Sequence, residues 1–193
     1  MKLMLDAGHG YGTTGKCTPD GFPEYAFNRK VAMYARKILE SYEGIEVYLP
    51  HSDCEDVSLS DRTERANTLK MDCYVSIHAN AFGDGSEWTS PEGIETYVYV
   101  SKPKEAMMLA NVVQSKLVKE TGRPNRGVKT ANFHVLRETK MTAILVECGF
   151  MTNKIEGYLL QMDPYQQQCA KAIAEGIASF YQLSERHGTC ILN

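Results

Sequence analysis

Three side chains that can bind a metal or carry a proton stand at or near the ends of predicted strands. His9 follows the first apolar segment, His78 ends the third, and Glu147 lies inside the apolar run 144–150. In open α/β sheets, ligands bind at the carboxyl ends of strands, so both histidines are well placed for a site. A carboxylate in an apolar strand is costly unless it is paired or lies near a metal. Glu147 is therefore the most informative residue on physical grounds.

Each of these residues also has an ordinary structural explanation. A single histidine at a strand end is commonly a hydrogen-bonded loop residue, and a single buried glutamate commonly belongs to an ion pair. Spacing and periodicity indicate a possible hydrolytic site and leave these alternatives open. They do not single out Glu24, an acidic residue ahead of a predicted helix.

The elements that would position these residues alternate between strand-like and helix-like segments, which favours an α/β fold. We expect a single twisted, mostly parallel sheet of about six strands with helices on both faces. The predicted strands cover residues 2–8, 45–49, 73–77, 93–100, 134–138 and 143–150. The predicted helices cover residues 28–42, 60–70 (capped by Ser60 or Asp61), 106–117 and 164–180.

Composition limits the classes of function. The chain has 193 residues, of which 43% are hydrophobic and 23% charged, with a net charge of -3. These values suit one compact domain, which we expect to span residues 1–183 and to be followed by a polar tail, 184–193. Basic and acidic residues are mixed along the chain, so we expect no nucleic-acid groove and no polybasic membrane anchor. No apolar run approaches the roughly 20 residues that cross a bilayer.

The N-terminus reads as a first strand and not as a signal peptide, because Asp6 interrupts it after a short apolar stretch. We therefore expect synthesis in the cytoplasm. We also expect the protein to be a monomer. The cysteines show no CxxC pair and are expected to be free thiols, with the third, fourth and fifth packed in apolar stretches. They are Cys17, Cys54, Cys73, Cys148, Cys169 and Cys190.

Seven sequence blocks occur in the order typical of one enzyme family. They are 5–10 (LDAGHG), 59–67 (LSDRTERAN), 75–81 (VSIHANA), 93–96 (GIET), 125–129 (NRGVK), 135–137 (VLR) and 145–153 (LVECGFMTN). On these blocks the chain resembles the zinc-dependent N-acetylmuramoyl-L-alanine amidases of the amidase-3 family, over roughly residues 3–181. One such block would be weak evidence, but seven in order are specific.

The resemblance implies a set of roles. His9, Glu24 and His78 would bind one Zn²⁺ with a fourth position open to water, whose pKa the metal lowers towards about 7. Glu147 would take the proton of that water and pass it to the departing amine. The implied partner is bacterial peptidoglycan, cut at the amide between N-acetylmuramic acid and L-alanine in the cell wall. Asn80 and Arg126 are candidates for substrate contact, with bracing of a loop as an equal alternative.

The chain departs from the family pattern at two places. Pro50-His51 stands where Thr-Arg is common, and Thr142 where Pro is common, which affects loop geometry and substrate preference but no expected ligand. His51 and His134 are expected not to be ligands, and His187 lies in the tail. Trp88, in the polar loop 82–92, is either a sugar-stacking residue or an ordinary loop residue.

Two other functions remain open on sequence. One is a zinc peptidase that cuts within the stem peptide. The other is a non-catalytic wall-binding module, which would be expected to lose one of the four site residues kept here. The biological setting also stays open between a phage endolysin, a mother-cell lysis enzyme and a secreted autolysin.

Overall fold

The computed structural model describes residues 1–186, which form six strands and six helices. The strands are β1 (Lys2–Ala7), β2 (Glu46–Tyr48), β3 (Cys73–Asn80), β4 (Ile94–Tyr99), β5 (Asn125–Ala131) and β6 (Thr142–Phe150). The helices are α1 (Glu24–Leu39), α2 (Leu59–Thr68), α3 (Lys104–Thr121), α4 (His134–Glu138), α5 (Lys154–Gln161) and α6 (Asp163–Phe180). The predicted α/β class is confirmed.

All six strands belong to one sheet in the order β2-β1-β3-β6-β4-β5. Neighbouring strands are parallel except for β4 and β6, which are antiparallel, so the predicted mostly parallel sheet is confirmed. From β1 the chain passes through α1 to β2 on one side, and then through α2 to β3 on the other side. The direction of the connections therefore changes between β1 and β3, which is where open α/β sheets bind ligands.

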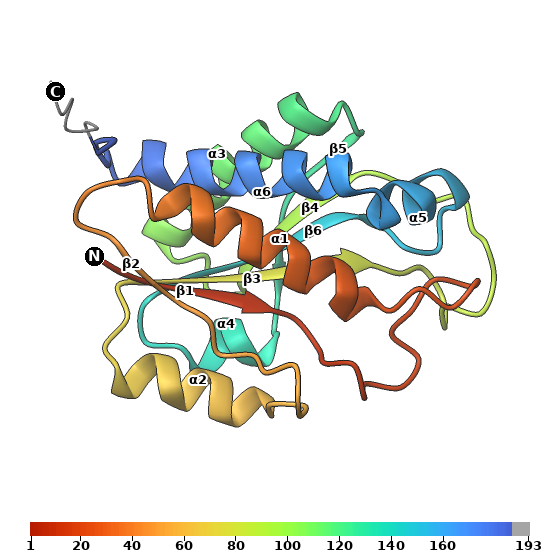
Figure 1. Ribbon diagram of the computed structural model, residues 1–193, viewed down its shortest axis with the longest axis horizontal. Coiled ribbons are helices and arrows are strands. Elements are labelled where there is room, and N and C mark those ends of the chain that lie inside the picture. The colour runs from red at the N-terminus through yellow and green to blue at the C-terminus, as the bar shows by residue number, and fades with distance from the viewer. Residues whose placement is uncertain (187–193) are drawn as a thin grey trace, which may run out of the picture.

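Helices cover both faces of the sheet (Figure 1), with α1, α3 and α6 on one face and α2 and α4 on the other. The larger core lies under α1, α3 and α6, and its fully buried members include Leu5, Val75, Ile144, Val31 and Ile173. The smaller core lies under α2 and α4 and includes Met4, Tyr74, Leu145, Val135 and Leu136. Because both faces are covered, the central strands β3 and β6 are almost continuously apolar in sequence.

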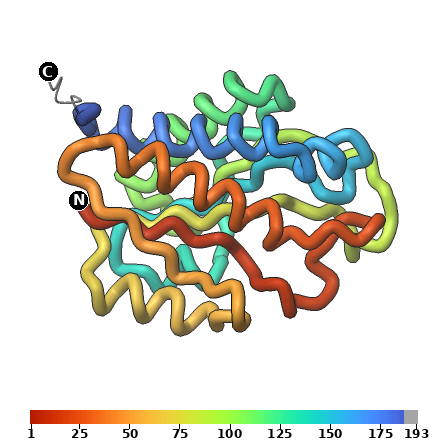
Figure 2. Tube along the Cα trace, in the orientation of Figure 1, coloured from red at the N-terminus to blue at the C-terminus, as the bar shows by residue number. Residues whose placement is uncertain are grey.

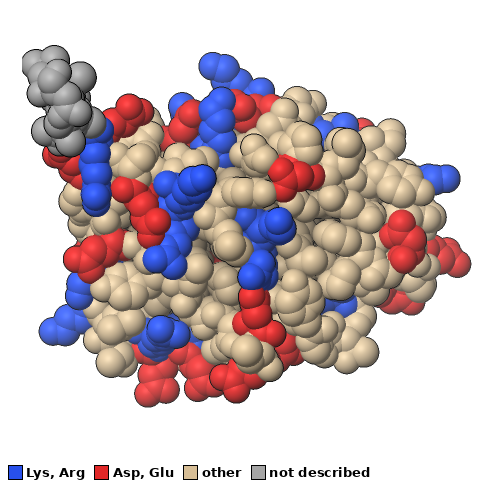
Figure 3. All heavy atoms as spheres, in the orientation of Figure 1, with Lys and Arg blue, Asp and Glu red and all other residues tan. Residues whose placement is uncertain are grey.

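Cys73, Cys148 and Cys169 are fully buried in the larger core, which confirms their expected packing role. The five cysteines within residues 1–186 are free thiols. On the face in Figure 3, basic side chains are interspersed with acidic ones. No helix within residues 1–186 combines the length and apolar character that a membrane crossing requires.

The start of the predicted tail is bonded to the domain. The amide of Glu43 donates to the carbonyl of Ser184, and the amide of Arg186 donates to the carbonyl of Ser41, each at 2.8 Å. Figure 2 shows the loop between α1 and β2 running beside the end of α6. The rest of the tail, with His187 and Cys190, lies outside the described residues.

One predicted element is wrong, and one strand is missing from the prediction. Residues 134–138 form the one-turn helix α4 and not a strand, because the adjacent apolar pair Val135 and Leu136 fits a helical turn against α2 as well as it fits a strand. Residues 125–129, which the sequence pattern places in no predicted strand, belong to the edge strand β5. That strand is mostly half-exposed or exposed and shows no apolar alternation, so its backbone pairing with β4 decides its structure.

Two helix boundaries also differ from the prediction, and one helix is additional to it. Helix α1 begins at Glu24 and not at residue 28, directly after Pro23. The N-cap of α2 is Ser58, whose hydroxyl accepts a hydrogen bond from the amide of Asp61. Helix α5 was not predicted, and its N-cap Asn153 accepts from two amides of the first turn.

Candidate metal centre

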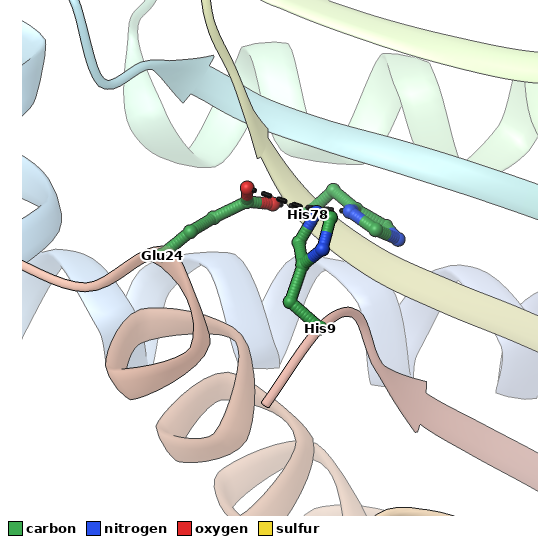
Figure 4. A group of neighbouring side chains, drawn as sticks. All are labelled: His9, Glu24 and His78. Atoms are coloured by element: carbon green, nitrogen blue, oxygen red, sulfur yellow. Dashed lines mark hydrogen bonds and ion pairs between the residues drawn. The ribbon is translucent and has the colours of Figure 1, made fainter. Parts of the chain in front are cut away.

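His9, Glu24 and His78 converge from three elements at the change of direction between β1 and β3 (Figure 4). His9 lies in the loop after β1, Glu24 is the first residue of α1, and His78 lies on β3. Nε2 of His9 is 3.1 Å from Oε2 of Glu24, and Nδ1 of His78 is 3.0 Å from Oε1 of the same carboxylate. The two imidazole rings are perpendicular, with centroids 5.1 Å apart.

Glu24 is buried, and its charge is held by several donors. Its Oε1 accepts hydrogen bonds from the Asn28 side chain and from the Ala79 amide, each at 3.1 Å. Burial raises the pKa of Glu24, but the contacts with His78 and His9 outweigh this and hold its pKa well below the usual range. Burial lowers the pKa of His78, yet its hydrogen bond to Glu24 gives a net rise. Glu24 is therefore a buried anion at the wall of the site, which suits a cation ligand.

A chain of buried polar groups supports His78 from behind. Nε2 of His78 lies 3.1 Å from the hydroxyl of Ser76, and that hydroxyl donates to Asp6 at 2.7 Å. Asp6 in turn accepts from Nη1 of Arg62 at 2.6 Å. Burial raises the pKa of Asp6, but Arg62 and Ser76 hold it below its ordinary value. The negative charge of Asp6, the last group in this series, is thus balanced by the buried guanidinium of Arg62.

Arg62 also holds the loop that carries His9. Its guanidinium donates to the carbonyl oxygens of Ala7 at 2.6 Å and of His9 at 2.5 Å. His9 has a φ of 65°, an unfavourable conformation for a residue with a Cβ, so these bonds help to maintain it. Gly8 makes room for the second imidazole, because a Cβ there would lie 2.0 Å from Cε1 of His78.

Sequence reasoning gave no role to Asp6, Ser76 or Arg62. The available signal was their position inside the blocks LDAGHG, VSIHANA and LSDRTERAN, beside or near the expected ligands. Spacing along the chain could not show the contact, because 56 residues separate Arg62 from Asp6.

Glu147 faces the same cleft as the three converging residues. The cleft has a volume of about 600 Å³, and its walls include His9, Glu24, His78 and Glu147. Glu147 pairs in register with His78 on the neighbouring strand, and its Oε2 is buried with no hydrogen-bond partner among the described residues. Burial raises the pKa of Glu147 to about 8. An orphaned buried oxygen at a cleft wall indicates a partner supplied by a ligand or by water.

The converging atoms fit a divalent metal of the zinc type. One ligand atom from each of the three residues lies within 4.8 Å of the others. Zn²⁺ with bonds of about 2.0–2.2 Å holds neighbouring ligands roughly 3.3 Å apart in tetrahedral geometry, close to the two contacts at Glu24. Two imidazoles and one carboxylate are a donor set of catalytic zinc sites, which keep a fourth position open.

The remaining candidate residues lie at different distances from this centre. Asn80 lines the cleft and donates to Glu95 at 3.0 Å, whereas Arg126 lies beyond it, also paired with Glu95. His134 is on the cleft wall, near the hydroxyl of Thr63. His51 is not part of the cleft wall, and its Nδ1 accepts a hydrogen bond from the amide of Ala7 at 3.4 Å.

Trp88 packs on α5, with its ring 6.0 Å from that of Tyr158. A Cβ on Gly157 would lie 2.7 Å from the Trp88 ring, which shows how closely the indole approaches the helix. The ring is therefore held against the protein and is not part of the cleft wall.

Fold and site together have the features of a hydrolase, with polar side chains that can bind a metal or carry a proton gathered near the carboxyl ends of parallel strands. The chain belongs to the N-acetylmuramoyl-L-alanine amidase family Amidase_3, whose sequence model matches residues 3–179.

Named relatives and solved structures agree with this assignment. The chain is 34% identical to N-acetylmuramoyl-L-alanine amidase CwlM of Bacillus licheniformis, over 96% of this chain and 70% of the relative. It is 35% identical to the endolysin of Bacillus phage SPP1, over 96% of this chain and 68% of the relative. The crystal structure of an N-acetylmuramoyl-L-alanine amidase from Clostridium difficile 630 superposes with a TM-score of 0.88 at 34% identity, covering 94% and 96% of the two chains.

Proposed function

We propose that residues 1–183 form a catalytic domain that hydrolyses the amide between N-acetylmuramic acid and L-alanine in the peptidoglycan of the bacterial cell wall. His9, Glu24 and His78 hold one Zn²⁺ in this proposal, and Glu147 is the acid–base. The observation that carries it is that Glu147, with a buried oxygen left unbonded, lines the same cleft as the three converging ligand atoms.

The roles of the ligands follow from their surroundings. Zn²⁺, when bound, polarises a carbonyl oxygen and makes water more acidic. Glu24 supplies the negative charge that would retain the cation, and the two imidazoles would supply neutral nitrogen donors. The Nε2–H of His78 donates to the hydroxyl of Ser76, so Nδ1 is the nitrogen that would bind the metal in place of its hydrogen bond to Glu24.

Glu147 carries the proton in both directions. Its Oε2 first accepts a proton from the attacking water and then delivers it to the amide nitrogen, because an amine leaves poorly unless it is protonated. Burial raises the pKa of Glu147 to about 8 in the metal-free protein. A bound cation would favour the ionised carboxylate that accepts the first proton, and burial favours the protonated carboxyl group that then delivers it.

Asn80 extends the polar wall of the cleft beside Glu147. Its side-chain oxygen accepts from the Ala81 amide, and one of its amide hydrogens goes to Glu95. Its second amide hydrogen is available to a carbonyl of the substrate. In this proposal the cleft wall therefore both orients the substrate and exposes it to Glu147.

The two alternative functions make different predictions. A peptidase that cuts within the stem peptide would use the same metal and acid–base groups but would release a different new amino terminus. A wall-binding module would need neither a proton carrier nor a metal-compatible donor set, and this chain retains both. Membership of the amidase family favours the first proposal.

The test is digestion of purified cell wall by the zinc-loaded protein, followed by mass spectrometry of the products. We expect peptides with a free L-alanine amino terminus, and no lysis after dialysis against a chelator until zinc is restored. A new amino terminus at a later residue of the stem peptide would establish the peptidase instead.

The matched variant is Glu147→Gln, with the exposed Glu64→Gln of α2 as control. Glu147→Gln should retain zinc and lose activity by about 100-fold or more, since proton transfer contributes 10²–10⁴-fold. The Glu64→Gln control should digest the wall at the wild-type rate. Full activity of Glu147→Gln would remove this residue from the mechanism.

A further inference from the structure

Glu95 on β4 is a buried carboxylate that holds two cations. It is 2% exposed, and its Oε1 accepts from Nε of Arg126 and from Nζ of Lys129. Its Oε2 accepts from Asn80 at 3.0 Å and from the hydroxyl of Tyr97 at 2.5 Å. One cation is sufficient to balance one carboxylate. The cluster therefore carries one positive charge in excess.

The cluster lies one strand further along the row that contains the proposed acid–base. Glu147 on β6 pairs in register with His78 on one side and with Glu95 on the other. Directly paired residues point to the same face of a sheet, and adjacent strands are about 4.8 Å apart. Lys129 on β5 pairs with Tyr97 in the same way. The metal ligand, the acid–base and the cationic cluster thus follow one another across one face.

Arg126 is held in position by more than its ion pair. Its guanidinium carbon lies 4.9 Å from the centre of the Phe150 ring. A Cβ on Gly93 would lie 3.1 Å from Cγ and Cδ of Arg126 and 2.4 Å from the carbonyl of Pro124, so a glycine is needed beside this side chain. Gly93 has a φ of 112°, which also favours glycine.

Both cations keep unused donors. Nη1 of Arg126 makes one long contact, at 3.4 Å to the carbonyl of Glu92, and Nη2 has no hydrogen bond within residues 1–186. The side chains of Arg126 and Lys129 are 36% and 38% exposed, so these donors reach solvent. A fixed guanidinium with spare hydrogens on both Nη groups matches a carboxylate, which it binds with two parallel hydrogen bonds.

We propose that Arg126 and Lys129 form a subsite for a carboxylate on the peptide half of the substrate, with Glu95 as the residue that positions them. This rests on the proposed function. In that substrate the lactyl carboxyl of the glycan is consumed in the scissile amide, so free carboxylates lie on the peptide. An extended peptide advances about 3.3–3.6 Å per residue. A carboxylate one or two residues beyond the cut therefore spans the distance from Glu147 to the cluster.

The alternative is that both cations only neutralise Glu95 next to Glu147. Under that alternative, removing a cation would slow all substrates equally by changing the field at Glu147. Under the subsite proposal, the loss is selective for substrates that carry the carboxylate. The two are separated by a pair of substrates that differ at this one group.

The experiment uses two synthetic muramoyl peptides that are identical except that the residue after L-alanine carries either a free carboxylate or a carboxamide. The zinc-loaded wild type should show a ratio of kcat/KM, acid over amide, of at least about ten, because a charge-assisted hydrogen-bond pair contributes roughly this factor. Most of the difference should be in KM. Arg126→Gln should bring the ratio close to one, Lys129→Gln should lower it partly, and Arg126→Lys should restore part of it.

Two further measurements separate the possible failures. Binding of the free product dipeptides, acid and amide, followed by NMR titration, should show the same preference without turnover. The exposed Arg65→Gln of α2 should keep the wild-type ratio. A wild type that cuts neither muramoyl peptide would overturn the proposed function. A wild type that cuts both equally, or an Arg126→Gln variant that keeps the preference for the acid, would overturn the subsite alone.

Discussion

The hydroxyl of Ser76 accepts from His78 and donates to Asp6, and this fixes which nitrogen of His78 faces the site. A serine hydroxyl has one proton, and the 2.7 Å bond to Asp6 uses it. The contact of 3.1 Å to Nε2 of His78 is therefore made by a proton on the ring. Nδ1, which lies 3.0 Å from Glu24, is therefore the nitrogen whose lone pair would bind a metal once the ring is neutral.

Ser76→Ala should weaken zinc binding while leaving the fold intact. Removal of the partner of a metal-binding histidine typically costs 10–100-fold in metal affinity. Zinc affinity can be measured by competition with a chromophoric chelator, with the exposed Ser60→Ala as control. An unchanged affinity in Ser76→Ala would show that the hydroxyl does not orient His78.

Arg62→Met should destabilise the protein by about 3–5 kcal/mol, because it leaves the charge of Asp6 buried and unpaired. Urea unfolding of the metal-free protein measures this loss. Asp6→Asn in the same background should recover part of it, since the amide carries no charge. Asp6→Asn should therefore cost less stability in Arg62→Met than in the wild type. Equal losses in the two backgrounds would show that the two side chains are not coupled.

Gly8→Ala should abolish zinc binding more completely than Ser76→Ala does. The new methyl would lie 2.0 Å from Cε1 and 2.3 Å from Nε2 of His78, so the ring must leave its position. Gly12→Ala is the control, because its methyl would meet only the carboxylate end of Asp56, at 3.2 Å. Wild-type zinc affinity in Gly8→Ala would show that the His78 ring can bind the metal from a different position.

Glu147 should make the metal-free protein less stable as the pH rises. The folded state holds the proton of Glu147 up to a pKa of about 8, whereas the unfolded chain releases it near 4.5. Between these values the folded state binds more protons, so stability falls by roughly 1 kcal/mol per pH unit. Urea unfolding between pH 5 and pH 8 should therefore show wild type losing stability relative to Glu147→Gln. Parallel curves would contradict the raised pKa.

The sequence predicts the parts of this molecule that have a strong local or family-specific pattern. The apolar run around Glu147 indicates a central strand because both sides of β6 are covered. Glu24 has no such signal, and only the family resemblance places it beside two histidines. The pattern predicts a strand where α4 forms and misses β5, because a buried apolar pair and a half-exposed edge strand carry little periodicity. The support from Arg62 to His78 depends on tertiary contacts that spacing does not encode.

Strand β5 is an edge of the sheet, and its composition has a consequence for the behaviour of the molecule in concentrated solution. Its outer side has backbone groups without a neighbouring strand of the same sheet. Such an edge can add a strand from another molecule, and charged side chains and irregular pairing oppose this. Arg126, Lys129 and the shift of register between Ile94 and Thr96 provide both features. The basic residues at this edge therefore also oppose edge-to-edge aggregation of the protein.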